Sequence, residues 1–115
     1  MKIIKKRPRI FTTGLKKQQI IKDVGIIKLN DNEMISLRTG KHKYHEITKK
    51  NWGFYATQSI NYRLKKNFKT ALVKNSQNRV FLMIIEKNKL KKFNRYCSEE
   101  KQKVIKWLDE IKVKR

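Results

Sequence analysis

The pattern of apolar and polar positions predicts β-strands in the first half of the chain. Residues 34–39 (MISLRT) alternate between apolar and polar side chains, which is the two-residue period of a half-buried strand. β-Branched residues fill 20–29, and a further strand fits 43–48, with turns of Asn, Asp or Gly between the three stretches. The first half is therefore predicted to be a β-meander.

The middle of the chain is expected to hold a short helix and a hairpin. Ser59 is a suitable N-cap for a helix over residues 60–66, which has apolar residues at i, i+4 spacing. Residues 70–74 and 79–86 are strand-like and flank a polar turn at 75–78. This arrangement predicts a β-hairpin.

Helical spacing is strongest near the C-terminus. Residues 89–96 fit a short helix, and Ser98 is predicted to cap a longer one whose first turn holds Glu99 and Glu100, where the helix dipole favours acids. The apolar stripe of that helix would be formed by Val104, Trp107, Leu108 and Ile111. The whole pattern predicts an α+β domain over residues 18–115, with an antiparallel β-sheet (meander plus hairpin), a short central helix and an amphipathic C-terminal helix.

Residues 1–17 form a strongly basic segment without any acid. Its cations are Lys2, Lys5, Lys6, Arg7, Arg9, Lys16 and Lys17. Pro8 and Gly14 interrupt the segment, and no helical or strand period is sustained, so we expect a flexible basic arm that orders on a partner. A plain solvated terminus is the alternative interpretation.

Charge is the strongest compositional signal. The 115 residues contain 31 Lys and Arg against 9 Asp and Glu, which gives a net charge of +22 and a pI near 10.4. A field of this size attracts polyanions. The excess of Lys over Arg and of Ile over Val is typical of an AT-rich genome, which explains the choice of lysine but not the scarcity of acids. The charge therefore predicts an anionic partner, with genome composition as the alternative cause.

The sequence lacks the patterns of a membrane or secreted protein. Its longest apolar run, Val80–Ile85, is far shorter than a membrane span, and no apolar region follows the basic N-terminus as in a signal peptide. Cys97 is the single cysteine, so an internal disulfide cannot form. We expect a small, soluble, cytoplasmic protein that does not bind membranes, and its oligomeric state is left open.

No constellation of residues predicts catalysis, a cofactor or a metal site. The four glycines are isolated, so a phosphate-binding loop is missing. His42 and His45 lack the spacing of a helical zinc motif and are expected to be surface histidines. Residues 47–85 contain no acid to hold Mg²⁺, and Cys97, expected just before a helix N-terminus, has no oriented histidine. We expect a non-catalytic protein.

The acid-free stretch 47–85 supplies the candidate binding residues. Its cations can neutralise phosphates, and its aromatic rings can stack on exposed bases. The predicted nucleic-acid-binding residues are Lys49, Lys50, Arg63, Lys65, Lys66, Lys69, Lys74 and Arg79, with Lys5, Lys6, Arg7 and Arg9 of the arm and with Tyr55 and Tyr62. Trp52, Phe54 and Phe68 are expected in the core. For Tyr55 and Tyr62, core packing and base stacking both stay open.

Three runs of sequence carry a family resemblance. They are Trp52–Asn61 (WGFYATQSIN) followed by Arg63-Leu64, Phe68–Asn75 (FKTALVKN), and Trp107–Asp109 (WLD). Over about residues 20–110 they resemble small uncharacterised bacterial proteins, some of which accompany surface-saccharide or nucleotide-sugar genes. The resemblance implies no established activity and no site residue. It adds an accessory domain of surface-saccharide metabolism to the alternatives.

Two functions follow from the charge. The first is non-catalytic binding of RNA or DNA through the phosphate backbone, with little sequence preference. The alternative is a protein-interaction module for an acidic partner or a larger assembly, which would use the hairpin edge for β-augmentation and the terminal helix for docking. Burial of Tyr55 and Tyr62 would favour the alternative, because buried rings cannot stack on bases.

Overall fold

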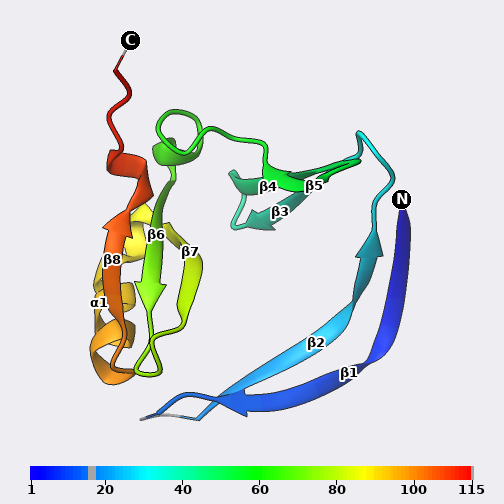
Figure 1. Cartoon of the computed structure of the whole chain (residues 1–115). Helices are drawn as coiled ribbons and strands as arrows, with labels where there is room; N and C mark the ends of the chain where they lie inside the picture. The colour runs from blue at the N-terminus through cyan, green and yellow to red at the C-terminus, as the bar shows by residue number, and fades with distance from the viewer. Residues whose placement is uncertain (16–17, 115) are drawn as a thin grey trace. The chain divides into compact units, whose positions relative to one another are not determined.

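A computed structural model describes residues 1–15 and 18–114, without the side chains of residues 6–8 (Figure 1). Its contacts divide the chain into two compact units. The first comprises Met1–Gly14 and Gln18–Thr57, and the second is built on the residues from Gln58 onward. The sequence grouped residues 18–115 into one domain, whereas the contacts divide this range after Thr57. Antiparallel strands dominate both units, and one α-helix lies in the second.

The N-terminal segment forms a two-stranded ribbon. Strands β1 (Lys2–Thr13) and β2 (Gln19–Lys28) pair antiparallel, with an irregularity in the register between Lys5 and Arg9. The prediction that residues 1–17 sustain no strand is therefore wrong for β1. No alternation revealed this strand because the apolar and charged side chains that the structure describes on it are exposed alike, so neither face of the ribbon is sorted toward a core. Pairing with β2 supplies the backbone partners instead.

The rest of the first unit is a three-stranded antiparallel sheet. Its strands, in the order β3-β4-β5, are Met34–Thr39, Lys43–Lys50 and Gly53–Ala56. The predicted strands at 34–39 and 43–48 are confirmed. The turns between strands contain Asn32 and Gly40 with positive φ, as their residue types allow. The predicted meander is not a single sheet, however, because β2 pairs with β1 and not with β3.

The second unit packs one helix against a three-stranded sheet. Strand β6 (Phe68–Lys74) lies between β7 (Val80–Glu86) and β8 (Lys103–Trp107), and helix α1 (Leu90–Glu99) packs against this sheet (Figure 1). The predicted hairpin is confirmed as β6–β7. Five buried side chains form the core: Ala71, Val73, Ile85, Phe93 and Cys97.

The predicted central helix is a single 3-10 turn. Residues 60–63 form a hydrogen-bonded turn, and only Leu64–Lys66 (η1) is helical, in the 3-10 form. Ser59 does act near its start, where its Oγ accepts a hydrogen bond from Arg63 N. Leu64 is the buried residue of η1, while Ile60 lies half-buried in the preceding turn and outside the helical residues.

The predicted C-terminal helix is wrong. A 3-10 turn, η2 (Lys87–Lys89), leads into α1, which ends where the longer helix was expected to begin. Lys101 has a φ of 53°, and Gln102 N donates to Cys97 O, which closes α1 with a Schellman-type bond. The chain then returns as β8 along the open edge of β6, and a further 3-10 turn, η3 (Leu108–Glu110), follows β8.

The end of α1 at Glu99 and the strand that follows it give several predicted residues new positions. Val104 and Trp107 lie half-buried on β8, because an irregularity in the β6–β8 register gives an i, i+3 pair the same inward face. Cys97 lies in the last turn of α1 and not before a helix N-terminus. Ser98 lies within α1 and is not the N-cap of a helix.

Across the described residues, no helix has the length and apolar character needed to cross a membrane.

Candidate nucleic-acid interface

The predicted binding residues are divided between the two units. Lys49, Lys50 and Tyr55 belong to the sheet of the first unit. The group from Tyr62 to Arg79 belongs to the second unit. Lys5 and Arg9 lie on the ribbon, whereas the side chains of Lys6 and Arg7 lie outside the described part of the structure, as do Lys16 and Lys17.

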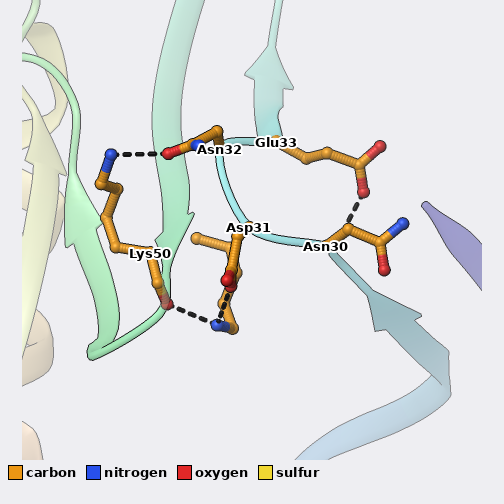
Figure 2. A network of polar contacts seen from close by, with 6 residues as sticks. Asn30, Asp31, Asn32, Glu33 and Lys50 are labelled. Carbon is orange, nitrogen blue, oxygen red and sulfur yellow. Dashed lines mark hydrogen bonds and ion pairs between the residues drawn. The ribbon is translucent and has the colours of Figure 1, made fainter.

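Lys50 contacts the loop that precedes β3, as Figure 2 shows, and Lys49 contacts the same loop. Lys49 Nζ lies 2.9 Å from Asp31 Oδ1 and also donates to Lys50 O. Lys50 Nζ donates to Asn32 Oδ1 over 2.6 Å. Main-chain hydrogen bonds from Asn32 N to Lys49 O (2.8 Å) and from Lys49 N to Glu33 O (2.9 Å) hold the loop against β4. Of the two cations, Lys49 is thus neutralised locally, while Lys50 has only a neutral partner among these contacts.

The acids of the same loop are also satisfied. Glu33 Oε1 accepts a hydrogen bond from Asn30 N (2.7 Å) and lies 2.8 Å from the Met1 ammonium. The hydrogen bond from that ammonium, together with the bond from Asn30 N, lowers the pKa of Glu33. Beside the loop, Asp31, Asn32, Lys50 and Asn51 line an open hollow of about 200 Å³. Its walls offer amide donors and acceptors, one cation, Lys50, and one carboxylate, Asp31, which is paired with Lys49.

The aromatic residues of the first unit are exposed. Trp52 has 68% of its surface in solvent, Phe54 63% and Tyr55 43%. The Trp52 and Tyr55 rings stack with centroids 6.0 Å apart and planes 26° apart. Trp52 and Phe54 were expected in the core, and this is wrong, whereas Phe68 is buried as expected. The sequence signal for the exposure of Trp52 was its position directly before Gly53. Asn51 and Trp52 form the two-residue turn between β4 and β5, and turn side chains lie at the surface.

A basic patch surrounds the 3-10 turn of the second unit. We call Tyr62, Arg63, Lys65 and Lys66 the η1 patch, and all four side chains are exposed. Leu64 between them is only 2% exposed and anchors the turn, which leaves its neighbours facing water. The Nζ of Lys66 lies 5.3 Å from the centroid of the Tyr62 ring. The patch therefore presents three cations and one open aromatic ring together.

Lys69 has a different environment from the η1 patch. Its Nζ lies 3.1 Å from Asp109 Oδ2, 3.6 Å from Glu110 Oε1 and 4.7 Å from the Trp107 ring centroid. Burial opposes ionisation of Asp109, but hydrogen bonds from Thr70 N and Lys69 Nζ outweigh it and lower the pKa of Asp109. Lys69 is therefore held in an internal ion pair, a role that the sequence did not reveal.

The remaining predicted cations lie near the β6–β7 hairpin turn and on the ribbon. Arg79 is exposed and Lys74 half-buried, and Asn75 Oδ1 shapes their turn by accepting hydrogen bonds from Gln77 N and Arg79 N. On the ribbon, Lys5 is exposed, as is Arg9, whose guanidinium lies 3.5 Å from Asp23. The Arg9 guanidinium also lies 5.4 Å from the centroid of the Phe11 ring, but the η1 patch places three exposed cations and an aromatic ring on one turn.

The sequence prediction also missed a group of exposed cations on α1. Lys91, Lys92 and Arg95 are exposed on α1, because Phe93 and Cys97 turn toward the core. The helical period of residues 89–96 could have found them, since cations opposite the buried Phe93 must face water. They lie outside the acid-free stretch on which the sequence prediction concentrated.

The groups with potential chemistry are dispersed. His42 is exposed, and His45 is half-buried on β4, where burial lowers its pKa against the opposing charge of Glu46. Burial also raises the pKa of the Cys97 thiol, which lies in the core. Within residues 1–15 and 18–114, no group of three His, Cys, Asp or Glu side chains could hold a metal ion.

Comparisons of this chain with known protein families, with curated proteins and with solved structures found no match. The resemblance carried by Trp52–Asn61, Phe68–Asn75 and Trp107–Asp109 therefore rests on the sequence alone. The exposed cations and aromatic rings are therefore the features of this chain that indicate a function.

Proposed function

We propose that this protein binds nucleic acid through the phosphate backbone and catalyses no reaction. The observation that carries the proposal is the η1 patch. Three exposed cations lie on one turn with an exposed Tyr62, and buried Leu64 fixes that turn. Cations neutralise phosphates and release counterions, while an open aromatic ring can stack on a base.

The placement of the acids supports an anionic partner. Asp31 pairs with Lys49, Asp109 with Lys69, and Glu86 with Lys89 at 3.1 Å. These contacts neutralise individual lysines locally. The excess positive charge, +22 over the whole chain, is therefore carried by other side chains, including those of the η1 patch and of the exposed side of α1. A surplus of this kind favours polyanions over neutral partners.

A second candidate is a protein-interaction module for an acidic partner. Within the described residues, β7 and β8 are the edge strands of the second sheet. Val80 and Leu82 on β7 are exposed, so an added strand could pair with that edge and cover them. Exposure of Tyr55 and Tyr62 favours nucleic acid, because it keeps stacking available.

Affinity measurements with matched charge variants test the proposal. Fluorescence anisotropy with a labelled random-sequence oligonucleotide of about 30 nucleotides compares the wild type with Arg63→Gln/Lys65→Gln/Lys66→Gln. The control, Lys91→Gln/Lys92→Gln/Arg95→Gln, removes the same charge from the same unit. We expect the first variant to lose at least about tenfold more affinity than the control.

Two results would count against nucleic-acid binding at the η1 patch. Equal losses in the two variants would assign binding to the long-range field and not to the patch. A wild-type Kd above ~0.1 mM at low salt would reject nucleic-acid binding altogether, because non-specific binders reach ~10⁻⁴ to 10⁻⁶ M at physiological salt.

A further inference from the structure

We propose that the Trp52–Tyr55 pair is a stacking platform for an unpaired nucleobase, so that the ligand is single-stranded nucleic acid. This inference rests on the proposed function and names its substrate class. The site consists of the two stacked rings at the β4–β5 turn and the neighbouring hollow lined by Asp31, Asn32, Lys50 and Asn51.

The geometry of the pair leaves one indole face open. Trp52 and Tyr55 stack at 6.0 Å, so one side of the indole is turned toward the tyrosine ring. The indole is nevertheless 68% exposed, and its other side faces solvent. Tyr55 supports the indole from behind and thereby restricts its rotamers, which lowers the entropy lost when a flat ligand stacks on it.

The position of Trp52 is not explained by folding. The two-residue turn Asn51-Trp52 is closed by pairing of Lys50 with Gly53, and the φ of 141° at Gly53 is a conformation that glycine adopts freely. The turn geometry therefore depends on Gly53 and not on an indole. A tryptophan usually contributes by burying area, and here it leaves most of that area in water.

The surroundings of the platform favour a nucleobase over a sugar or an apolar peptide. Lys50 lines the hollow beside Asp31, whose carboxylate is already paired with Lys49. The Nζ of Lys50 has a neutral partner, Asn32, and can approach a phosphate. The side-chain amides of Asn32 and Asn51 can meet the donors and acceptors on a base edge. In a duplex the base faces are already stacked, so an aromatic platform selects unpaired strands.

The experiment compares single-stranded and duplex forms of one oligonucleotide of about 12 nucleotides. A Trp107→Phe variant leaves Trp52 as the single fluorophore of its kind, because the chain has two tryptophans. We expect the single strand to quench Trp52 emission and the duplex to leave it unchanged. Trp52→Ala should lose about 5- to 150-fold in affinity for the single strand, which corresponds to one stacked base, and nothing for the duplex.

Phe54→Ala is the matched control. Phe54 is equally exposed and lies on the same hairpin, but adjacent strand residues point to opposite faces, so it does not share a face with Tyr55. We expect this variant to bind like the wild type. A loss equal to that of Trp52→Ala would overturn the assignment of the platform.

The outcomes separate this inference from the proposed function. Equal affinity for both forms without quenching of Trp52 overturns the platform and leaves backbone binding standing. Failure of the wild type to bind either form rejects both. Quenching by the neutral oligosaccharide maltohexaose would assign the rings to a sugar and overturn the nucleobase.

Discussion

The ammonium of Lys69 lies 3.1 Å from Oδ2 of Asp109, whose side chain is only 2% exposed. Asp109 Oδ1 also accepts a hydrogen bond from Thr70 N over 3.0 Å. Lys69 and Thr70 lie on β6, while Asp109 lies in η3 directly after β8. One carboxylate thus fastens the end of the chain to the central strand of its sheet.

Replacement of Asp109 by Ala should lower the free energy of unfolding by about 3 kcal/mol, because it removes the acceptor of the buried Thr70 N–H and the nearer of the two carboxylates beside Lys69. Urea unfolding followed by circular dichroism measures this change. Lys89→Ala, which removes the more exposed Glu86–Lys89 pair, is the control and should cost under about 1 kcal/mol. Equal costs would show that Asp109 does not fasten the sheet.

The same carboxylate predicts a pH dependence. The pKa of Asp109 is lowered on folding from its ordinary 3.8, so its stabilisation is fully present above that value and is lost as the pH falls through the lower folded value. Asp109→Asn should therefore show a weaker fall in unfolding free energy than the wild type between about pH 4 and pH 2. Parallel curves for the two proteins would contradict the lowered pKa.

Leu64 should be the anchor of the η1 patch. Leu64→Ala removes a side chain that is 2% exposed and should destabilise the second unit by about 2–5 kcal/mol. Leu82→Ala, an exposed leucine of the same unit, should change stability by less than about 0.5 kcal/mol. Thermal unfolding measures both variants, and similar shifts would show that Leu64 is not part of the core.

Gly25 should be required for the ribbon. A Cβ at this position would lie 2.6 Å from the main-chain oxygen of Ile4, so Gly25→Ala forces the paired strands apart. We expect faster amide hydrogen exchange in β1 and β2 of this variant, with unchanged unfolding of the second unit. Val24→Ala, which changes an exposed neighbour, is the control. Exchange rates that match between the two variants would contradict the close approach.

The sequence predicts strands and turns well where local chemistry decides them. Alternation along Met34–Thr39 and the polar turn after Lys74 correspond to β3 and to the β6–β7 hairpin. Asn32 and Asn78 take positive φ in turns, as their residue type favours. These features depend on neighbours in the sequence, which periodicity can register.

Long-range pairing decided the elements that the sequence did not predict. Val104 and Trp107 fit a helical stripe, yet the open edge of β6 recruits them into β8. The i, i+3 spacing is ambiguous, because a strand with an irregular register gives the same inward pair. β1 was missed for a related reason: its partner β2 supplies hydrogen bonds, but neither strand has a buried face that would sort its residues.

The candidate site was predictable in part. The exposed cations of the η1 patch follow from the acid-free stretch, but the internal role of Lys69 depends on Asp109, which lies 40 residues away. The exposure of Trp52 follows from a turn whose strands the sequence only loosely indicated. Tertiary partners, and not residue type, decided which cations and rings remain free.

The salt dependence of nucleic-acid affinity is the decisive measurement. For a random single strand of about 30 nucleotides, log Kobs should fall linearly with log salt concentration, by about 0.7 for each phosphate contact. Arg63→Gln/Lys65→Gln/Lys66→Gln should reduce that slope by about 2, because three cations of the η1 patch are removed. A wild-type slope near zero, or a slope that this triple variant leaves unchanged, would contradict backbone binding at the η1 patch.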